Sequence, residues 1–211
     1  MARRAQQMAL PILKVKLGDK DDAERVQSIR KATQAVLRVD ANASWSLDSA
    51  KALLPILHAC GVELLEQPLA VGDLEGLRAL RMRTPRPPIF VDESIRTTSD
   101  IEAHAGIVDG VVIKLAKCGG IREAIRQIEL AHHLGMRAMM GCMVESSVAV
   151  TAAATIAPLT DLVDLDTPLL IANDPFDGLK YDGARIILPE APGLGLTHAS
   201  SAVAVTNGSR D

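Results

Sequence analysis

Short apolar runs alternate with longer amphipathic segments along most of the chain. The apolar runs are mostly aliphatic and cover residues 12–17, 35–39, 62–65, 88–91, 110–115, 137–140 and 162–165. The amphipathic segments cover residues 21–33, 47–60, 74–82, 99–105, 121–134 and 147–157. Strands that alternate with helices in this way predict parallel βα units, in which the helices cover the outer face of one sheet.

Residues at the ends of these helices favour the same boundaries. Ser46 or Asp48 would cap the second helix, and Thr98 or Ser99 would cap the fourth. Glycine follows three of the helical segments, where a left-handed residue commonly ends a helix: Gly61, Gly106 and Gly135.

Composition narrows the classes of protein that the chain can represent. It has 211 residues, of which 48% are hydrophobic, so it can bury a core as one domain, for which we expect residues 1–196. The last residues, 197–211, are small and polar and predict a disordered tail. A net charge of −3 and few aromatic residues argue against a nucleic-acid or membrane partner. Widely spaced cysteines without CxxC pairs suggest free thiols in the cytoplasm: Cys60, Cys118 and Cys142.

Charged residues recur at the ends of the predicted strands. Their positions, with one turn included, are Lys16, Asp40, Glu66, Asp92, Lys114, the turn at residues 141–145, and Asp164 with Asp166. The spacing between successive positions is 22 to 27 residues, which is one βα unit each time. Because the carboxyl ends of the strands of a (β/α)₈ barrel meet at one face, this period predicts that the charges line a single active site.

Three of these residues are carboxylates on consecutive strand ends: Asp40, Glu66 and Asp92. Hard carboxylate oxygens suit Mg²⁺, with Mn²⁺ as an alternative, better than zinc. Converging carboxylates would repel one another strongly without a cation. The sequence therefore predicts a divalent metal site at this face.

Lysines are placed on both sides of the predicted metal site. Lys14 and Lys16 alternate along one strand, so both face the barrel interior, and each should lower the pKa of the other. Lys114 lies four strands from Lys16, roughly across the barrel. Bases on opposite sides of a metal-bound carboxylate could remove an α-proton and return it on the other face. Lys117 is the less favoured base, since on an extended segment its side chain would alternate away from that of Lys114.

The motifs around these residues resemble the muconate-lactonizing subgroup of the enolase superfamily (the mandelate racemase/muconate lactonizing enzymes), and within it the dipeptide epimerases of the L-Ala-D/L-Glu type. The matching motifs, in chain order, are LKVKLG, VDANASW, LEQPL, VDES, IKLAKCGGI, GCMVESS and DLDTPLL. With the following DGARIILPEAPGLGL they span about 185 of the 211 residues. The order and spacing of the motifs, rather than any one of them, carry the resemblance.

The resemblance implies a role for each matching position. Asp40, Glu66 and Asp92 match the Mg²⁺ ligands, and Asn42 and Glu93 would support them from behind. Lys16 and Lys114 match the two acid/base lysines, with Lys14 as an electrostatic modulator of Lys16. Asp164 and Asp166 match acids that receive the free ammonium group of a dipeptide, and Met143 would line the pocket near its side chain.

The resemblance also implies elements that this sequence does not contain. Members of the family carry a capping domain and a first barrel strand before the strand that holds the paired lysines, which here begins at about residue 12. We therefore expect an incomplete TIM-type (β/α) barrel of about seven βα units, which looks N-terminally truncated. Residues 182–196 match a segment that returns to pack on the cap.

Three functions remain open from the sequence. The first is Mg²⁺-dependent epimerisation of a dipeptide, which would make the protein an isomerase, active as it stands or with a partner that supplies the missing parts. A homo-oligomer is a possible form of the protein. The second is another reaction of the superfamily, of the muconate cycloisomerase or o-succinylbenzoate synthase type; those substrates have no ammonium group, so Asp164 and Asp166 argue against it. The third is a truncated barrel that holds the ligands but is catalytically inert.

Overall fold

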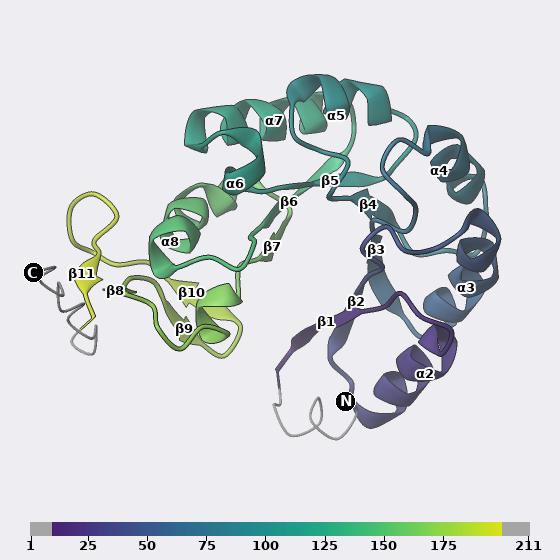
Figure 1. The fold of residues 1–211 in the computed structure, drawn as a ribbon, viewed down its shortest axis with the longest axis horizontal. Coiled ribbons are helices and arrows are strands. Elements are labelled where there is room, and N and C mark those ends of the chain that lie inside the picture. The colour runs from purple at the N-terminus through teal and green to yellow at the C-terminus, as the bar shows by residue number, and fades with distance from the viewer. Residues whose placement is uncertain (1–9, 200–211) are drawn as a thin grey trace, which may run out of the picture.

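The computed structural model describes residues 10–199, and its main feature is a seven-stranded parallel sheet. The strands follow one another in chain order from β1 to β7, and Figure 1 shows the sheet curved into an open arc with helices on its outside. β1 and β7 form the two ends of the sheet and do not pair with each other. The expectation of an incomplete (β/α) barrel with seven units is confirmed.

The predicted strands and helices are all present, with ends shifted by one or two residues. The strands of the sheet are β1 (Ile12–Lys16), β2 (Val36–Asp40), β3 (Val62–Glu66), β4 (Ile89–Val91), β5 (Gly110–Ile113), β6 (Arg137–Gly141) and β7 (Leu162–Asp164). The helices are α2 (Asp22–Ala32), α3 (Leu47–Ala59), α4 (Leu74–Arg81), α5 (Thr98–His104), α6 (Leu115–Cys118), α7 (Ile121–His133) and α8 (Ser147–Ile156). The one-turn helix α6 was not predicted.

The helix ends confirm most of the expected caps and correct one. The Ser46 side chain accepts a hydrogen bond from the backbone N of Ser49 at the start of α3. The cap of α5 is Thr97, and our choice of Thr98 or Ser99 is wrong by one or two residues. Thr97 caps the helix because it forms a reciprocal capping box with Asp100. The three glycines have backbone φ between 65° and 73°, as a left-handed helix end requires: Gly61, Gly106 and Gly135.

The sheet buries side chains on both of its faces. The outer face packs against the helices, and the inner face holds a smaller cluster made of Leu64, Phe90, Val112 and Met139, with Leu162 beside it. At the amino end of β5 the Phe90 ring lies so close to Gly110 that a Cβ there would be 2.3 Å from it. The guanidinium of Arg137 lies 5.0 Å from the centre of the same ring. This apolar cluster lies on the inner face of the sheet, on β3 to β7.

Short elements complete the chain after α8. They are the 3₁₀ turns η1 (Ala157–Leu159) and η2 (Thr167–Leu169) and the strands β8 (Phe176–Asp177), β9 (Lys180–Asp182), β10 (Arg185–Ile187) and β11 (Thr197–His198). β9 pairs with β10 and β8 with β11, each antiparallel. Thr197 and His198, at the start of the segment predicted as a tail, form β11, and residues 200–211 of that segment lie outside the described residues.

Within residues 10–199, none of the helices has the length and apolar character needed to cross a membrane.

Candidate active site

The three carboxylates predicted as metal ligands stand at neighbouring strand ends on the carboxyl edge of the sheet. Asp40 and Glu66 are paired residues at the ends of β2 and β3, and Asp92 follows the last residue of β4. Asp40 and Glu66 are 0% exposed and Asp92 is 3% exposed. Burial of three acids at one edge costs free energy unless positive charge compensates them.

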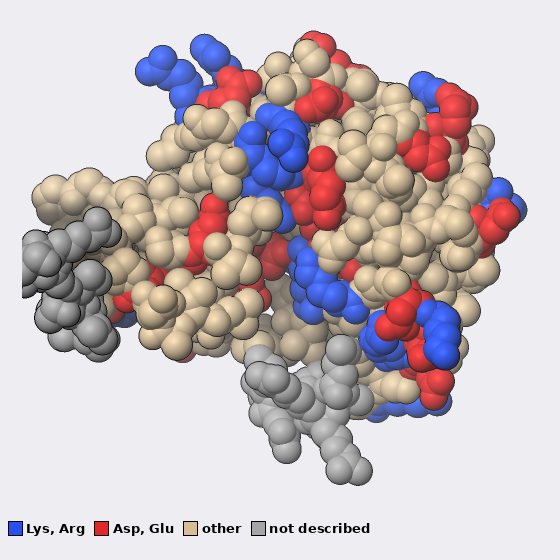
Figure 2. Space-filling model, in the orientation of Figure 1, with Lys and Arg blue, Asp and Glu red and all other residues tan. Residues whose placement is uncertain are grey.

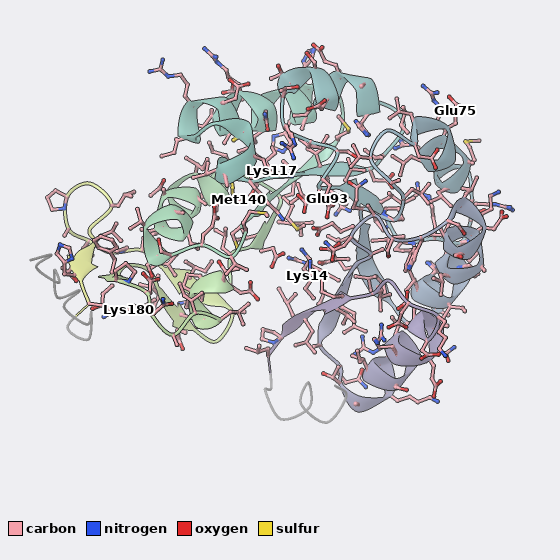
Figure 3. All side chains as sticks on the ribbon, viewed as in Figure 1. Lys14, Glu75, Glu93, Lys117, Met140 and Lys180 are labelled. Atoms are coloured by element: carbon pink, nitrogen blue, oxygen red, sulfur yellow. The ribbon has the colours of Figure 1, made fainter. Side chains whose placement is uncertain are left out.

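Two lysines of β1 approach these acids from one side. The Lys14 ammonium lies 3.0 Å from Glu66 Oε1 and 2.9 Å from Oε2, and it donates a 2.6 Å hydrogen bond to Asp164 Oδ2 on β7. Lys16 donates a 2.5 Å hydrogen bond to Asp40 Oδ2. Figure 3 shows Lys14 pointing into the inner side of the arc, and Figure 2 shows basic and acidic side chains next to one another on this face. Lys14 therefore links the two ends of the open sheet.

Two more lysines meet at Asp92 from the opposite side. Lys114, directly after β5, lies 2.7 Å from Asp92 Oδ2 and 3.8 Å from the Met143 sulfur. Lys117 donates to Asp92 Oδ1 and to the Asp92 backbone carbonyl. Our expectation that Lys117 would point away is wrong, because residues 115–118 form α6 and one helical turn brings its side chain back to the same acid.

The two acid/base candidates differ in their access to solvent. The Lys16 side chain is 61% exposed, whereas that of Lys114 is 9% exposed. The β1 side of the site is therefore open, and the β5 side is enclosed.

Glu66 carries the least compensated charge of the three acids. Burial, together with the neighbouring charges of Asp40 and Asp92, raises the pKa of the Glu66 carboxyl to about 8 in spite of Lys14. The Oε2 atom of Glu66 is buried, and although the Lys14 ammonium lies 2.9 Å away, this oxygen accepts no well-aligned hydrogen bond from the described residues. A group of this kind is a candidate for a functional role.

The charges of the lysines correct one expectation. Burial lowers the pKa of Lys14, but the surrounding carboxylates of Glu66, Asp164 and Asp40 outweigh it, so the pKa is raised. Burial also lowers the pKa of Lys114, but Asp92 and Glu66 together outweigh it, so this pKa is likewise raised. We expected paired lysines to lower each other's pKa; among these residues the attraction of the acids is the larger effect. Of these buried lysines only Lys117 has a lowered pKa, and the cause is its burial.

The donor set fits a hard divalent cation. Within the described part of the chain, no three His, Cys, Asp or Glu side chains are already gathered around one point, because lysines hold the carboxylate oxygens. The acids are nevertheless buried, adjacent and all oxygen donors, as Mg²⁺ sites require. A divalent ion at Glu66 Oε2 would compete with the Lys14 ammonium for the same charge.

Two predicted supporting residues contact each other. Asn42 donates from its side chain to Glu93 Oε1 at 3.1 Å, and its backbone N donates to Asp40 Oδ1 at 2.9 Å. Glu93 Oε2 is buried without a hydrogen-bond partner among residues 10–199. The structure thus joins Asn42 to the loops that carry Asp40 and Asp92.

The residues predicted to bind substrate lie at the same edge. Asp164 ends β7 and contacts Lys14, while Asp166 lies two residues further on. Burial and the nearby Asp164 raise the pKa of Asp166. Asp166 precedes η2, but its side chain makes no capping hydrogen bond there, so a structural capping role does not account for it. Met143 is 48% exposed at the rim, with its sulfur toward Lys114.

One residue of the site was missed altogether. Gln67 is fully buried directly behind Glu66 and makes hydrogen bonds to the loop that carries Asp92. The LEQP motif contains it, but nothing in the pattern of residues distinguishes its glutamine from an ordinary loop residue.

Comparison with known proteins gives a family model and several relatives. The model described as "Enolase C-terminal domain-like" matches residues 1–202. A protein of Bacteroides thetaiotaomicron named L-Ala-D/L-Glu epimerase is 42% identical over 187 residues, which are 88% of this chain and 48% of that protein. A protein of Flavobacteria bacterium named hydrophobic dipeptide epimerase is 43% identical over 190 residues, 87% of this chain and 54% of that protein. The chain spans about half the length of these curated relatives.

Solved structures give the same likeness. The dipeptide epimerase of Cytophaga hutchinsonii, complexed with Mg and the dipeptide D-Ala-L-Val, superposes with a TM-score of 0.87 at 33% identity. The match covers 95% of this chain and 58% of that one. The N-succinyl Arg/Lys racemase of Bacillus cereus superposes with a TM-score of 0.88 at 30% identity, over 96% of this chain and 58% of that one.

Proposed function

Because this chain belongs to the Enolase C-terminal domain-like family, we propose that the carboxyl edge of its sheet is the Mg²⁺-dependent active site of a dipeptide epimerase. The resemblance inferred from the motifs is confirmed at the level of the family. The observation that carries the proposal is the placing of Lys16 and Lys114 on opposite sides of three buried carboxylates. The relatives named as epimerases support the choice of reaction.

Asp40, Glu66 and Asp92 would hold the cation. When bound, Mg²⁺ would supply positive charge to the substrate carboxylate and so lower the energy of the enolate formed next to it. Mn²⁺ offers the same oxygen preference and would serve as an alternative.

The lysines perform the proton transfer. On one face of the α-carbon a lysine in its neutral form takes the proton, and the electron pair of the C–H bond passes into the enolate. The pKa of Lys114, raised here by Asp92 and Glu66, would fall once a cation shares the charge of these acids. On the other face a protonated lysine returns a proton to the same carbon, which inverts its configuration. Lys16 and Lys114 fill these two roles, exchanging them with the direction of the reaction. Lys14, two residues before Lys16 on β1, adds positive charge beside it.

Asp164 and Asp166 would bind the free ammonium group of the dipeptide. Asp164 forms an ion pair with Lys14, and Asp166 carries a carboxyl whose pKa is raised by burial and by Asp164. An incoming ammonium group would offer Asp166 a positive partner, and among residues 10–199 no ion pair supplies one. A substrate without that group, such as a muconate, a succinylbenzoate precursor or an N-succinyl amino acid, would leave these acids uncompensated. The two acids at the end of β7 therefore favour a dipeptide as substrate.

The test follows hydrogen exchange at the α-carbon by NMR in D₂O. We expect L-Ala-L-Glu or related L-Ala dipeptides to incorporate deuterium and give a second diastereomer when Mg²⁺ is present. The Asp166→Asn variant should weaken this exchange. It should leave exchange of an N-succinyl amino acid, if there is any, unaffected.

The outcome also separates the proposal from an inert barrel. A cooperative unfolding transition whose midpoint rises with Mg²⁺ shows that the protein is folded and binds the ion. If a sample that passes this check shows no α-proton exchange, the proposed function is contradicted and a catalytically inert barrel is favoured.

A further inference from the structure

Gln67 stands between the metal-site acid Glu66 and Pro68, and its conformation is unusual. The residue is 0% exposed, and its backbone φ is 35°, in the left-handed region that non-glycine residues rarely adopt. Pro68 should in addition favour an extended backbone at the residue before it. A conformation this unfavourable persists only where surrounding contacts hold it, and such residues cluster at functional sites.

The side chain of Gln67 holds the loop after β4. Its Oε1 accepts hydrogen bonds from the backbone N of Asp92 at 2.9 Å and of Ser94 at 3.3 Å. Its Nε2 donates to the Leu69 carbonyl at 2.8 Å and to Ser94 Oγ at 2.9 Å. Both ends of the amide are therefore used, and one of the contacts is to the backbone of a proposed metal ligand.

The backbone of Gln67 reaches the loops on both sides. Its N–H donates to the Phe90 carbonyl of β4 at 2.8 Å, and its carbonyl accepts from the Ala43 N–H after β2 at 2.8 Å. Gln67 thus connects the ends of β2, β3 and β4, which are the three strand ends that carry Asp40, Glu66 and Asp92.

We propose that Gln67 is a positioning residue of the metal site, which sets the spacing of these three strand ends so that their carboxylates face one point. The inference rests on the proposed function and assigns a residue to it beyond the ligands. Because Gln67 is uncharged, its loss would change the placing of the ligands without changing the charge of the site. Because misplaced ligands bind the ion less well, we expect the affinity for Mg²⁺ to fall.

The experiment compares two buried glutamines. Gln67→Met keeps the length of the side chain and removes its hydrogen bonds. Gln127→Met is the matched control, since Gln127 on α7 is also 0% exposed and donates to a backbone carbonyl, that of Arg96. Binding of Mg²⁺ is measured by isothermal titration calorimetry, and stability by urea unfolding without the ion. We expect Gln67→Met to bind Mg²⁺ about 10–100-fold more weakly, the effect usual for residues that orient metal ligands. Gln127→Met should lose stability and keep the wild-type affinity.

Each other outcome has a distinct meaning. If Gln67→Met loses stability but binds Mg²⁺ as tightly as the wild type, Gln67 only supports the fold and the inference is overturned. If the wild type itself does not bind Mg²⁺, the proposed function fails and the positioning role fails with it. Should Gln67→Met not fold, Ser94→Ala removes one of the two acceptors of Gln67 Nε2 and keeps the other, the Leu69 carbonyl. We then expect weaker Mg²⁺ binding by Ser94→Ala, and unchanged binding would overturn the inference.

Discussion

Ion pairs lie at both the amino and the carboxyl edge of the sheet, partly buried at the first and buried at the second, and the two edges balance their charges differently. At the amino end each acid has its own partners: the Asp109 carboxylate accepts hydrogen bonds from Arg86 at 2.5 and 3.2 Å and from the Ile89 backbone N at 2.8 Å. At the carboxyl end Asp40, Glu66 and Asp92 crowd together, and Glu66 Oε2 accepts no well-aligned hydrogen bond from the described residues.

The difference appears in the direction of the pKa shifts. Burial raises the pKa of Asp109, but its hydrogen bonds from Arg86 and Ile89 outweigh this and the pKa is lowered. For Glu66 burial and its acidic neighbours win, and the pKa is raised. The amino end is thus arranged for stability, whereas the carboxyl end retains unbalanced charge that a cation and a substrate could neutralise.

The largest expected effect is on proton transfer at the carboxyl end. Lys114→Met should lower α-proton exchange of the dipeptide by about 10²–10⁴-fold, the usual contribution of a general acid or base. The measurement is the initial rate of deuterium incorporation by NMR. Lys180→Met, which changes an exposed lysine on β9 far from the site, is the control and should keep the wild-type rate. Exchange by Lys114→Met close to the wild-type rate would show that this lysine is not the base.

A substitution at the amino end should affect stability instead. Asp109→Asn removes a charged partner of Arg86 and should destabilise the fold by roughly 1–3 kcal/mol. Urea unfolding measures this, and Glu75→Gln is the control, because the exposed pair of Glu75 with Arg78 contributes little. Affinity for Mg²⁺ should not change. A loss of affinity in Asp109→Asn would mean that the two ends are not independent.

A substitution that neutralises Glu66 should increase the stability of the fold, whereas Asp109→Asn should decrease it. Because burial raises the pKa of Glu66 to about 8, this carboxyl must take up a proton when the protein folds near neutral pH, and that costs stability. Glu66→Gln removes the cost, so we expect the protein to gain about 1 kcal/mol of stability without Mg²⁺. Urea unfolding in the presence and absence of Mg²⁺ tests this, since the variant should no longer be stabilised by the ion. A variant that is less stable than the wild type in both conditions would contradict the contrast between the two ends.

The smallest effect is a pH dependence at the amino end. The pKa of Asp109 is lowered in the folded state, so its pairing contributes stability above the unfolded pKa of about 3.9. This contribution is lost as the pH falls through the lower, folded value. The stability difference between wild type and Asp109→Asn should therefore be constant near neutral pH and shrink below about pH 4. A difference that grows in acid would reverse the assigned direction.

Much of the fold could be predicted because its signal is local. Strands such as that at residues 62–65 and helices such as that at residues 47–60 follow from the hydrophobic pattern, and the period of the charges places their ends at one edge. The turn at Lys117 could not be predicted in this way, because a four-residue helix leaves no periodic pattern. The small strands after η2, such as β9, are equally short and depend on tertiary contacts, as when Tyr181 donates to the Leu165 carbonyl at 2.5 Å.

In the candidate site, too, residues with a local signal could be predicted and residues that depend on tertiary contacts could not. Asp40, Glu66 and Asp92 could be chosen because acids after apolar strands are visible in the sequence. Gln67 could not, since its role depends on a left-handed backbone and on hydrogen bonds to other loops. The raised pKa of Lys14 was also missed, because it results from the combined attraction of three carboxylates whose positions the sequence does not show: Glu66, Asp164 and Asp40.

The most direct test of the cation site is to locate an ion in it. Crystals grown with Mn²⁺, which prefers the same oxygen ligands as Mg²⁺, give an anomalous signal that identifies the metal by its position. We predict one peak between the carboxylates of Asp40, Glu66 and Asp92, with the Lys14 ammonium moved away from Glu66. A structure in which Mn²⁺ binds elsewhere, while Lys14 keeps its contact with Glu66, would contradict the account.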